Sequence, residues 1–161
     1  METKRAAHIP ARNQRLSDDS YQGSPNPIFI TIRAEQGSPF LDNRELCLVT
    51  IRLLREMRVQ YGCWVSAYCL MPDHLHYVAG AETDGSDVRL FTNRFKGRST
   101  NTSWKYGWTG SLWQKRFHDH VVRVGEELDN VEAYVLDNPR RAGLISDPGE
   151  WEWSGVFDPS G

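Results

Sequence analysis

Residues 63–80, CWVSAYCLMPDHLHYVAG, contain two runs rich in β-branched and aromatic residues on either side of a Pro-Asp pair. Such runs around turn-forming residues predict two neighbouring strands joined by a tight corner, which is a β-hairpin. His74 and His76 lie two residues apart in the second run, where alternate side chains of a strand point to one face. We therefore expect the two imidazoles to lie side by side, with Leu75 and Tyr77 on the opposite face.

A pair of imidazoles on one strand face can ligate a single cation. The same pair can also be two half-exposed strand histidines that bind no metal. Short motifs of this kind occur by chance, so the motif alone leaves both interpretations open.

Length and composition indicate one globular domain. The chain has 161 residues, of which 25% are charged and 39% are hydrophobic. Its apolar stretches are too short to cross a bilayer, and residues 1–20 lack the apolar core of a secretion signal. Three cysteines without a close-spaced pair, Cys47, Cys63 and Cys69, are expected to be buried, reduced thiols.

The net charge of −2 hides a basic segment. Between Arg89 and Arg123 there are eight basic residues, and Asp119 is the one acidic residue among them, a local balance of +7. A basic segment on an acidic protein can be a phosphate-binding surface, or it can be a solvated helix face. Both interpretations remain open at this point.

The remaining patterns predict the order β-α-β-β-α-β-α. This order is typical of an α+β, ferredoxin-like sandwich, and we expect an antiparallel sheet with helices packed on one face. The domain is expected to span residues 26–145. The predicted elements are a loosely held N-terminal arm (1–25), a strand (27–34), helices over 44–61 and 86–106, a strand (117–124), a helix over 126–138 stopped by Pro139, and an irregular tail (146–161).

A second motif, EAYVLDNPRRAGL at residues 132–144, places Tyr134 and Asn138 four residues apart on the last predicted helix, hence on one face. A tyrosine hydroxyl can attack a phosphodiester when a cation neutralises the phosphate. Two imidazoles and one amide oxygen can hold Mg²⁺ or Mn²⁺. Taken singly, Tyr134 is equally explained as a half-buried helix aromatic, and Asn138 as a C-terminal cap.

Together, three stretches resemble the REP-associated tyrosine transposases, a branch of the single-tyrosine HUH transposases. They are CLMPDHLHYVAG (69–80), LWQKRFHDHVV (112–122) and AYVLDNPRRAGLI (133–145). The resemblance covers about residues 26–155. It implies that His74 and His76 are the metal pair, that Asn138 completes the metal site, and that Tyr134 forms a 5′-phosphotyrosine link with single-stranded DNA.

The resemblance further implies a metal-dependent DNA endonuclease and strand transferase that acts near palindromic hairpins. Such a protein would be cytoplasmic, associated with the nucleoid and with no membrane, and either a monomer or a homodimer. The candidate DNA contacts are Arg94, Lys96, Arg98, Lys115, Arg116, Arg140 and Arg141. Trp104, Trp108 and Trp113 are candidates for base stacking or for core packing.

Two other functions remain open. The chain has a second His-x-His pair, His118 and His120, so a four-histidine metal hydrolase that uses a bound water is one alternative. The resemblance places this pair near the site on an inner strand, where packing or hydrogen bonding is the expected role. A DNA-hairpin-binding module without catalysis is the other alternative.

Overall fold

The computed structural model describes residues 16–23 and 26–159, in which five strands form one antiparallel sheet in the order β4-β1-β3-β2-β5. The strand order and the two helical crossovers confirm the α+β, ferredoxin-like class. The strands are β1 (Ile28–Arg33), β2 (Cys63–Met71), β3 (His74–Ala81), β4 (His118–Val121) and β5 (Ser154–Val156). The helices are α1 (Asp18–Tyr21), α2 (Arg44–Gln60), α3 (Val88–Ser103) and α4 (Glu126–Arg141), with short 3₁₀ turns η1 (Trp104–Tyr106) and η2 (Pro148–Glu150).

The predicted hairpin is present. Strands β2 and β3 pair antiparallel from Met71 opposite His74 to Cys63 opposite Ala81, with two residues at the corner. Strand β1 lies between β3 and β4, so it places its own side chains next to those of the histidine strand.

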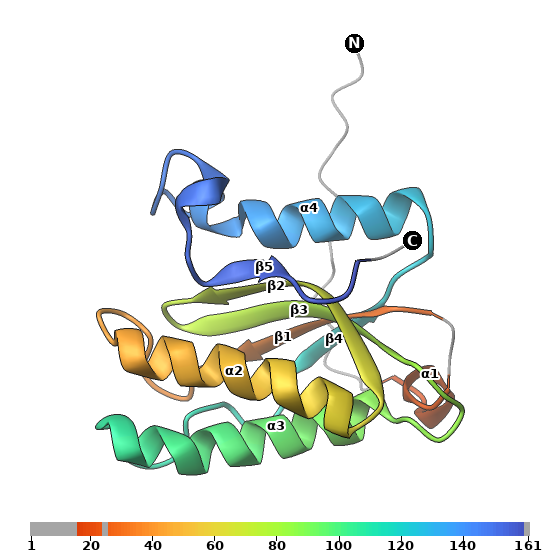
Figure 1. Ribbon diagram of the computed structural model, residues 1–161, viewed down its shortest axis with the longest axis horizontal. Coiled ribbons are helices and arrows are strands. Elements are labelled where there is room, and N and C mark those ends of the chain that lie inside the picture. Colours follow the sequence, from red (N-terminus) through yellow and green to blue (C-terminus); the bar gives the residue numbers. More distant parts are fainter. Residues whose placement is uncertain (1–15, 24–25, 160–161) are drawn as a thin grey trace.

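Helices α2 and α3 cover one face of the sheet (Figure 1). Helix α2 begins at Asn43, whose side chain accepts from the Leu46 N–H, and it is closed by Gly62 at φ +64°, a conformation that favours glycine. Its apolar stripe packs against β2 and α3, in the same core cluster as Leu75 and Tyr77 of β3. Helix α3 runs through Gly97 without interruption.

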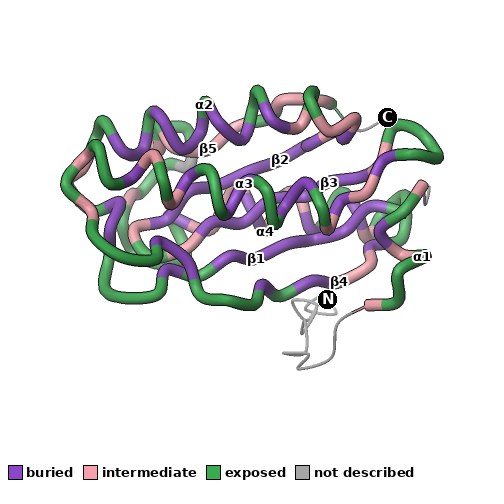
Figure 2. Tube along the Cα trace, turned by 90° about the horizontal axis from the view of Figure 1, so that it is seen from below, coloured by how far each residue is buried: buried purple, intermediate pink, exposed green. Residues whose placement is uncertain are grey.

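Helix α4 covers the opposite face, so the expectation that helices pack on one face is wrong for this helix (Figure 1). Its stripe of Leu128, Val131 and Val135 packs against a second apolar sheet face that includes Phe29 and Val78. The central strands are buried on both sides (Figure 2), and strands of that kind need a layer on each face.

Helix α4 does not stop before Pro139 as predicted, and it continues to Arg141. The proline lies in the last turn, where its fixed φ suits a helix and it removes one N–H bond, its own. The helix is instead closed by Gly143 at φ +76°, with bonds from the Gly143 N–H to the Arg140 carbonyl and from the Leu144 N–H to the Pro139 carbonyl.

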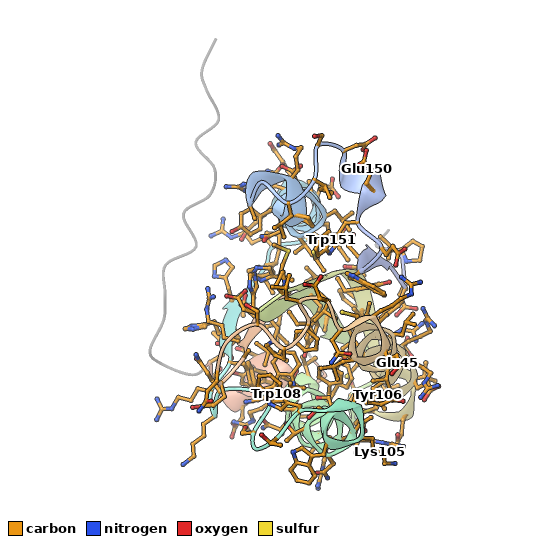
Figure 3. All side chains as sticks on the ribbon, turned by 90° about the vertical axis from the view of Figure 1, so that its left-hand side faces the viewer. Glu45, Lys105, Tyr106, Trp108, Glu150 and Trp151 are labelled. Carbon is orange, nitrogen blue, oxygen red and sulfur yellow. The ribbon has the colours of Figure 1, made fainter. Side chains whose placement is uncertain are left out.

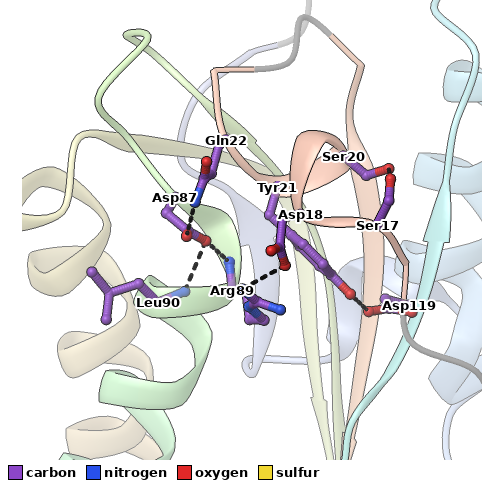
Figure 4. A network of polar contacts seen from close by, with 9 residues as sticks. All are labelled: Ser17, Asp18, Ser20, Tyr21, Gln22, Asp87, Arg89, Leu90 and Asp119. Atoms are coloured by element: carbon purple, nitrogen blue, oxygen red, sulfur yellow. Dashed lines mark hydrogen bonds and ion pairs between the residues drawn. The ribbon is translucent and has the colours of Figure 1, made fainter.

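Residues 16–23, part of the predicted loose arm, contact the folded domain (Figure 4). The Tyr21 side chain is fully buried, and its hydroxyl donates to Asp119 of β4. Arg89 of α3 lies 5.1 Å over the Tyr21 ring and pairs with Asp18 at 2.8 Å. The rest of the predicted arm, residues 1–15 and 24–25, lies outside the described residues.

The C-terminal segment is also more ordered than the predicted irregular tail. Residues Ser154–Val156 form β5 and extend the sheet beside β2. Asp158 accepts from Arg58 of α2 and from the Val65 N–H. Backbone pairing at a sheet edge can hold a short strand with little sequence signal of its own, which is why the pattern did not reveal it.

All three cysteines are buried and unpaired, as predicted. Burial raises the pKa of the Cys47 thiol to about 11 and those of Cys63 and Cys69 to about 12. Within residues 16–23 and 26–159, no helix is both long and apolar enough to cross a membrane.

Candidate active site

His74 and His76 lie side by side on the face of β3 that α4 covers, as their spacing predicted. Their ring centroids are 4.5 Å apart, and the rings are close to perpendicular. His76 is 6% exposed, and the neighbouring Val78 belongs to the core cluster under α4. Leu75 and Tyr77 face the other way, into the core under α2 and α3.

Each imidazole is oriented by a hydrogen bond at Nδ1. The His76 Nδ1 lies 2.8 Å from the Thr31 Oγ1 on β1, and the His74 Nδ1 lies 2.7 Å from an Asp73 carboxylate oxygen. These bonds leave the Nε2 atom of each ring as the nitrogen that can ligate a cation. Hydrogen bonds of this type fix the tautomer and the orientation of metal-binding histidines.

Thr31 and Asp73 were missed as site residues by sequence reasoning. Asp73 was assigned to the corner because of its turn preference, although its position next to His74 was a usable signal. Thr31 gives no local signal, because it meets His76 only through the register of β1 against β3.

Burial favours the neutral form of both imidazoles. Burial lowers the pKa of His76 to about 3, with further lowering from His74 and Arg33. Burial also lowers the pKa of His74, and this effect is opposed by the hydrogen bond to Asp73. Neutral imidazole is the form that ligates metal ions, so the pair need not release protons before binding one.

Tyr134 projects from α4 onto the histidine strand. Its ring centroid lies 6.3 Å from that of His76 and 6.2 Å from that of Phe29, with edge-to-face geometry in both pairs. Phe29 in turn stacks on His76 at 5.4 Å. The fold therefore brings together a tyrosine and a histidine that are 58 positions apart in the chain.

Asn138 lies one helical turn after Tyr134, on the same stripe of α4, and is half-buried. No group of three or more His, Cys, Asp or Glu side chains that could hold a metal ion occurs among the residues that the structure describes. A cation bound by the histidine pair would therefore need a ligand of another type, and the Asn138 amide oxygen is the candidate on the facing helix. Two imidazoles and one amide oxygen would fill three positions around such a cation and leave further positions for phosphate and water ligands.

The second histidine pair does not join the first. His118 and His120 lie on β4, which is an edge strand and not the inner strand expected, because only β1 borders it. His118 is exposed, and the His120 Nε2 lies 3.4 Å from a carboxylate oxygen of Glu127 on α4. Strand β1 separates both residues from the His74–His76 pair.

The predicted DNA-contacting residues fall into two groups. Arg94 and Arg98 are exposed on α3, and Lys115 and Arg116 are exposed in the segment that runs beside it. Lys96, at 9% exposed, ties that segment to α3 by donating to the Lys115 carbonyl at 2.8 Å, a placement that counts against a phosphate contact for Lys96. The second group, Arg140 and Arg141, lies on α4 and hence on the opposite face of the sheet.

The three tryptophans after α3 differ in exposure. Trp113 is buried, contacts Phe40 and Phe95, and donates to the Ser99 hydroxyl, so it is a core residue. Trp104 is 53% exposed and Trp108 is half-buried. Figure 3 shows Trp108 on the α3 side of the molecule, with Trp151 near α4.

A model of a known protein family matches more than half of this chain. Residues 38–138 match the family model described as "Transposase IS200 like". This match includes both histidines of the pair, the tyrosine that faces them and Asn138. The chain belongs to this family.

Similar proteins point the same way. Over 98 residues the chain is 26% identical to a protein of Haemophilus influenzae assigned to the REP-associated tyrosine transposases, covering 55% of this chain and 56% of that protein. Over 104 residues it is 22% identical to a REP-associated tyrosine transposase of Escherichia coli, covering 65% and 58%. The matches thus span a little over half the length of these family relatives.

The fold is also that of a solved structure of a REP-associated tyrosine transposase bound to a REP hairpin. The TM-score is 0.73 over 90% of this chain and 82% of that chain, at 17% sequence identity. The arrangement of sheet and helices described above is therefore a known transposase fold.

Proposed function

We propose that this protein is a metal-dependent single-stranded DNA endonuclease and strand transferase that acts near palindromic hairpins through a 5′-phosphotyrosine intermediate. Membership in the transposase family supports a DNA-processing enzyme. The main support for this mechanism is the contact between the Tyr134 ring on α4 and the His76 ring on β3. A nucleophile and a candidate metal ligand meet there from two separate layers of the fold.

The chemistry assigned to Tyr134 is a phosphoryl transfer. Its hydroxyl oxygen attacks the phosphorus of the scissile phosphodiester, so a Tyr–O–P bond forms while the P–O3′ bond breaks. The phenolic proton passes to solvent, and the leaving 3′ oxygen takes up a proton to become a 3′-OH. His74, His76 and Asn138 would hold the cation, which would neutralise the phosphate and stabilise the leaving oxygen.

We assign binding of the hairpin stem to the basic surface formed by α3 and the segment beside it. Arg94 and Arg98 are exposed, and no carboxylate pairs with either of them among the ion pairs of the described residues. Removal of one phosphate-binding cation from such a surface reduces the log–log salt slope of binding by about 0.7–0.9. The Arg94→Gln/Arg98→Gln double variant is therefore expected to bind DNA more weakly and with a flatter salt dependence, as measured by fluorescence anisotropy.

The four-histidine hydrolase is less well supported. It needs His118 and His120 to join the first pair, yet β1 lies between the two histidine strands and His120 contacts Glu127. A binding module without catalysis differs from our proposal only in its chemistry, so experiment must separate the two.

The test uses a library of single-stranded oligonucleotides that carry randomised stem-loops and flanks, incubated with the protein and Mg²⁺ or Mn²⁺. A 3′-end label detects a covalent protein–DNA adduct on a denaturing gel, and a 5′-end label detects the released fragment ending in a 3′-OH. The wild type should give both products. Tyr134→Phe should bind DNA but give neither product, whereas Tyr61→Phe, a change in another half-buried tyrosine, should behave as the wild type.

Nicking without an adduct, or nicking by Tyr134→Phe, would contradict the phosphotyrosine mechanism and favour a water nucleophile. Binding without either product under all metal conditions would favour the binding module.

A further inference from the structure

Three polar side chains lie on one stripe of α4. Residues four and seven positions after Tyr134 return close to the same face of a helix, and these positions hold Asn138 and Arg141. Arg141 belongs to the helix only because α4 continues through Pro139. Long side chains on a helix point back toward its N-terminus, so Arg141 can reach the tyrosine two turns before it.

The structure shows this contact. The Arg141 guanidinium carbon lies 4.5 Å from the centroid of the Tyr134 ring, within cation–π range. The same ring meets Phe29 and His76 edge to face on its sheet side. Tyr134 is thus held by two aromatic rings of the sheet and by one cation of its own helix.

The neighbouring Arg140 is placed quite differently. Its guanidinium makes two hydrogen bonds of 2.6 Å to the Asp137 carboxylate, and Asp137 holds the pKa of Arg140 above its usual range through that contact. The two arginines are adjacent, both exposed and equal in charge, yet one faces the tyrosine and the other faces a carboxylate.

We propose that Arg141 is a positioning residue for Tyr134, an inference that rests on the proposed tyrosine chemistry. Its guanidinium fixes the ring so that the hydroxyl stays aligned beside the histidine pair. A guanidinium stacked on a ring keeps its N–H donors at the edge, where they can bind a phosphate oxygen. Binding of the scissile phosphate would therefore hold the Tyr134 ring more tightly in place and would not displace the ring.

The experiment compares Arg141→Met, Arg141→Lys and the matched control Arg55→Met. Arg55 of α2 makes a similar cation–π contact, 5.2 Å from the Phe157 ring centroid, and lies outside the candidate DNA contacts. The DNA is the oligonucleotide recovered from the wild-type adduct, and the readouts are its Kd and the single-turnover cleavage rate at saturating DNA. Small misalignment of reacting groups can slow a reaction by about 100-fold. We expect Arg141→Met to cleave about 10- to 100-fold more slowly with a Kd within about threefold of the wild type. Arg141→Lys should recover part of the rate, and Arg55→Met should retain all of it.

A second readout needs neither metal nor DNA. The chain has six tyrosines, and fluorine NMR of protein labelled with 3-fluorotyrosine reports the surroundings of each ring. The resonance that Tyr134→Phe lacks belongs to Tyr134. This resonance should shift or broaden in Arg141→Met and stay unchanged in Arg55→Met.

The outcomes separate the inference from the proposed function. Two results would overturn the positioning role. One is an unchanged Tyr134 resonance together with a wild-type cleavage rate in Arg141→Met. The other is an equal loss of DNA affinity in Arg141→Met and Arg55→Met with no loss of cleavage rate in either. Failure of the wild type to form any adduct would overturn the phosphotyrosine mechanism, and with it the role of Arg141 in attack.

Discussion

The Thr31 hydroxyl and the His76 Nδ1 atom lie 2.8 Å apart across two paired strands. Thr31 and His76 are both buried, each at 6% exposed. The bond therefore fixes which nitrogen of His76 is left for a ligand, at a place where water does not compete for it.

We predict that Thr31→Val weakens metal binding much more than it weakens the fold. Loss of a partner behind a metal-binding histidine typically lowers metal affinity by about 10- to 100-fold. The free energy of unfolding should fall by only about 1 kcal/mol, as for one buried hydrogen bond. Titration calorimetry with Mn²⁺ and urea denaturation measure the two effects.

Thr92→Val is the matched control, because Thr92 makes a 2.6 Å hydrogen bond to the Tyr77 hydroxyl in the opposite core. It should lower stability and leave Mn²⁺ affinity unchanged. Equal effects of the two variants on Mn²⁺ affinity would show that the Thr31 contact has no special role.

The metal ligands themselves give the second prediction. His74→Ala, His76→Ala and Asn138→Ala should each weaken Mn²⁺ binding, measured as the loss of free Mn²⁺ signal in electron paramagnetic resonance. His120→Ala should bind as the wild type does, because His120 faces Glu127. Loss of Mn²⁺ binding on changing His118 or His120 would instead support the four-histidine site.

A pH dependence of stability follows from the burial of His76. Its folded-state pKa is about 3, below the reference value of 6.5, so the unfolded chain takes up a proton between these values and the folded protein does not. The metal-free protein should therefore lose stability as the pH falls from about 6.5, by up to about 1.4 kcal/mol per pH unit for this group. Urea denaturation between pH 7 and pH 5 should show that the unfolding free energy of His76→Asn changes less with pH than that of the wild type. An identical slope in both proteins would contradict this assignment.

What could be predicted from the sequence was mainly local. The hairpin, its corner and the shared face of His74 and His76 follow from strand alternation and turn residues within 63–80. The single stripe of Tyr134 and Asn138 follows from helical spacing in the same way. These patterns depend on neighbouring residues only, so the fold did not alter them.

The remaining features depend on contacts between distant segments. The side of the sheet that α4 covers could not be predicted, because the central strands are apolar on both faces and either face could receive a helix. Thr31 joins the site through strand register, and Arg141 joins it because Gly143, and not Pro139, ends the helix. The burial of Tyr21 needs Asp119, which is 98 positions away.

The Tyr21–Asp119 contact predicts a stability role for the N-terminal segment. Tyr21→Phe keeps the ring in the core but removes the hydroxyl that donates to the buried Asp119 carboxylate. A buried acceptor left without its donor costs about 1–3 kcal/mol. Urea denaturation should show this loss for Tyr21→Phe and little change for Tyr61→Phe. A loss no larger than that of the control would mean that the ring alone anchors segment 16–23.

The last prediction concerns the C-terminal strand. Burial opposes ionisation of Asp158, but hydrogen bonds from Arg58 and from the Val65 N–H outweigh this effect and hold the pKa of Asp158 below its usual range. Asp158→Asn should therefore cost about 1.5–3 kcal/mol of stability, the range of a hydrogen bond to a charged group, and should speed amide exchange in β5. Glu152→Gln is the control, because its ion pair with Arg44 is solvent-exposed and such pairs contribute little. If both variants left exchange in β5 unchanged, backbone pairing with β2 alone would account for the order of this strand.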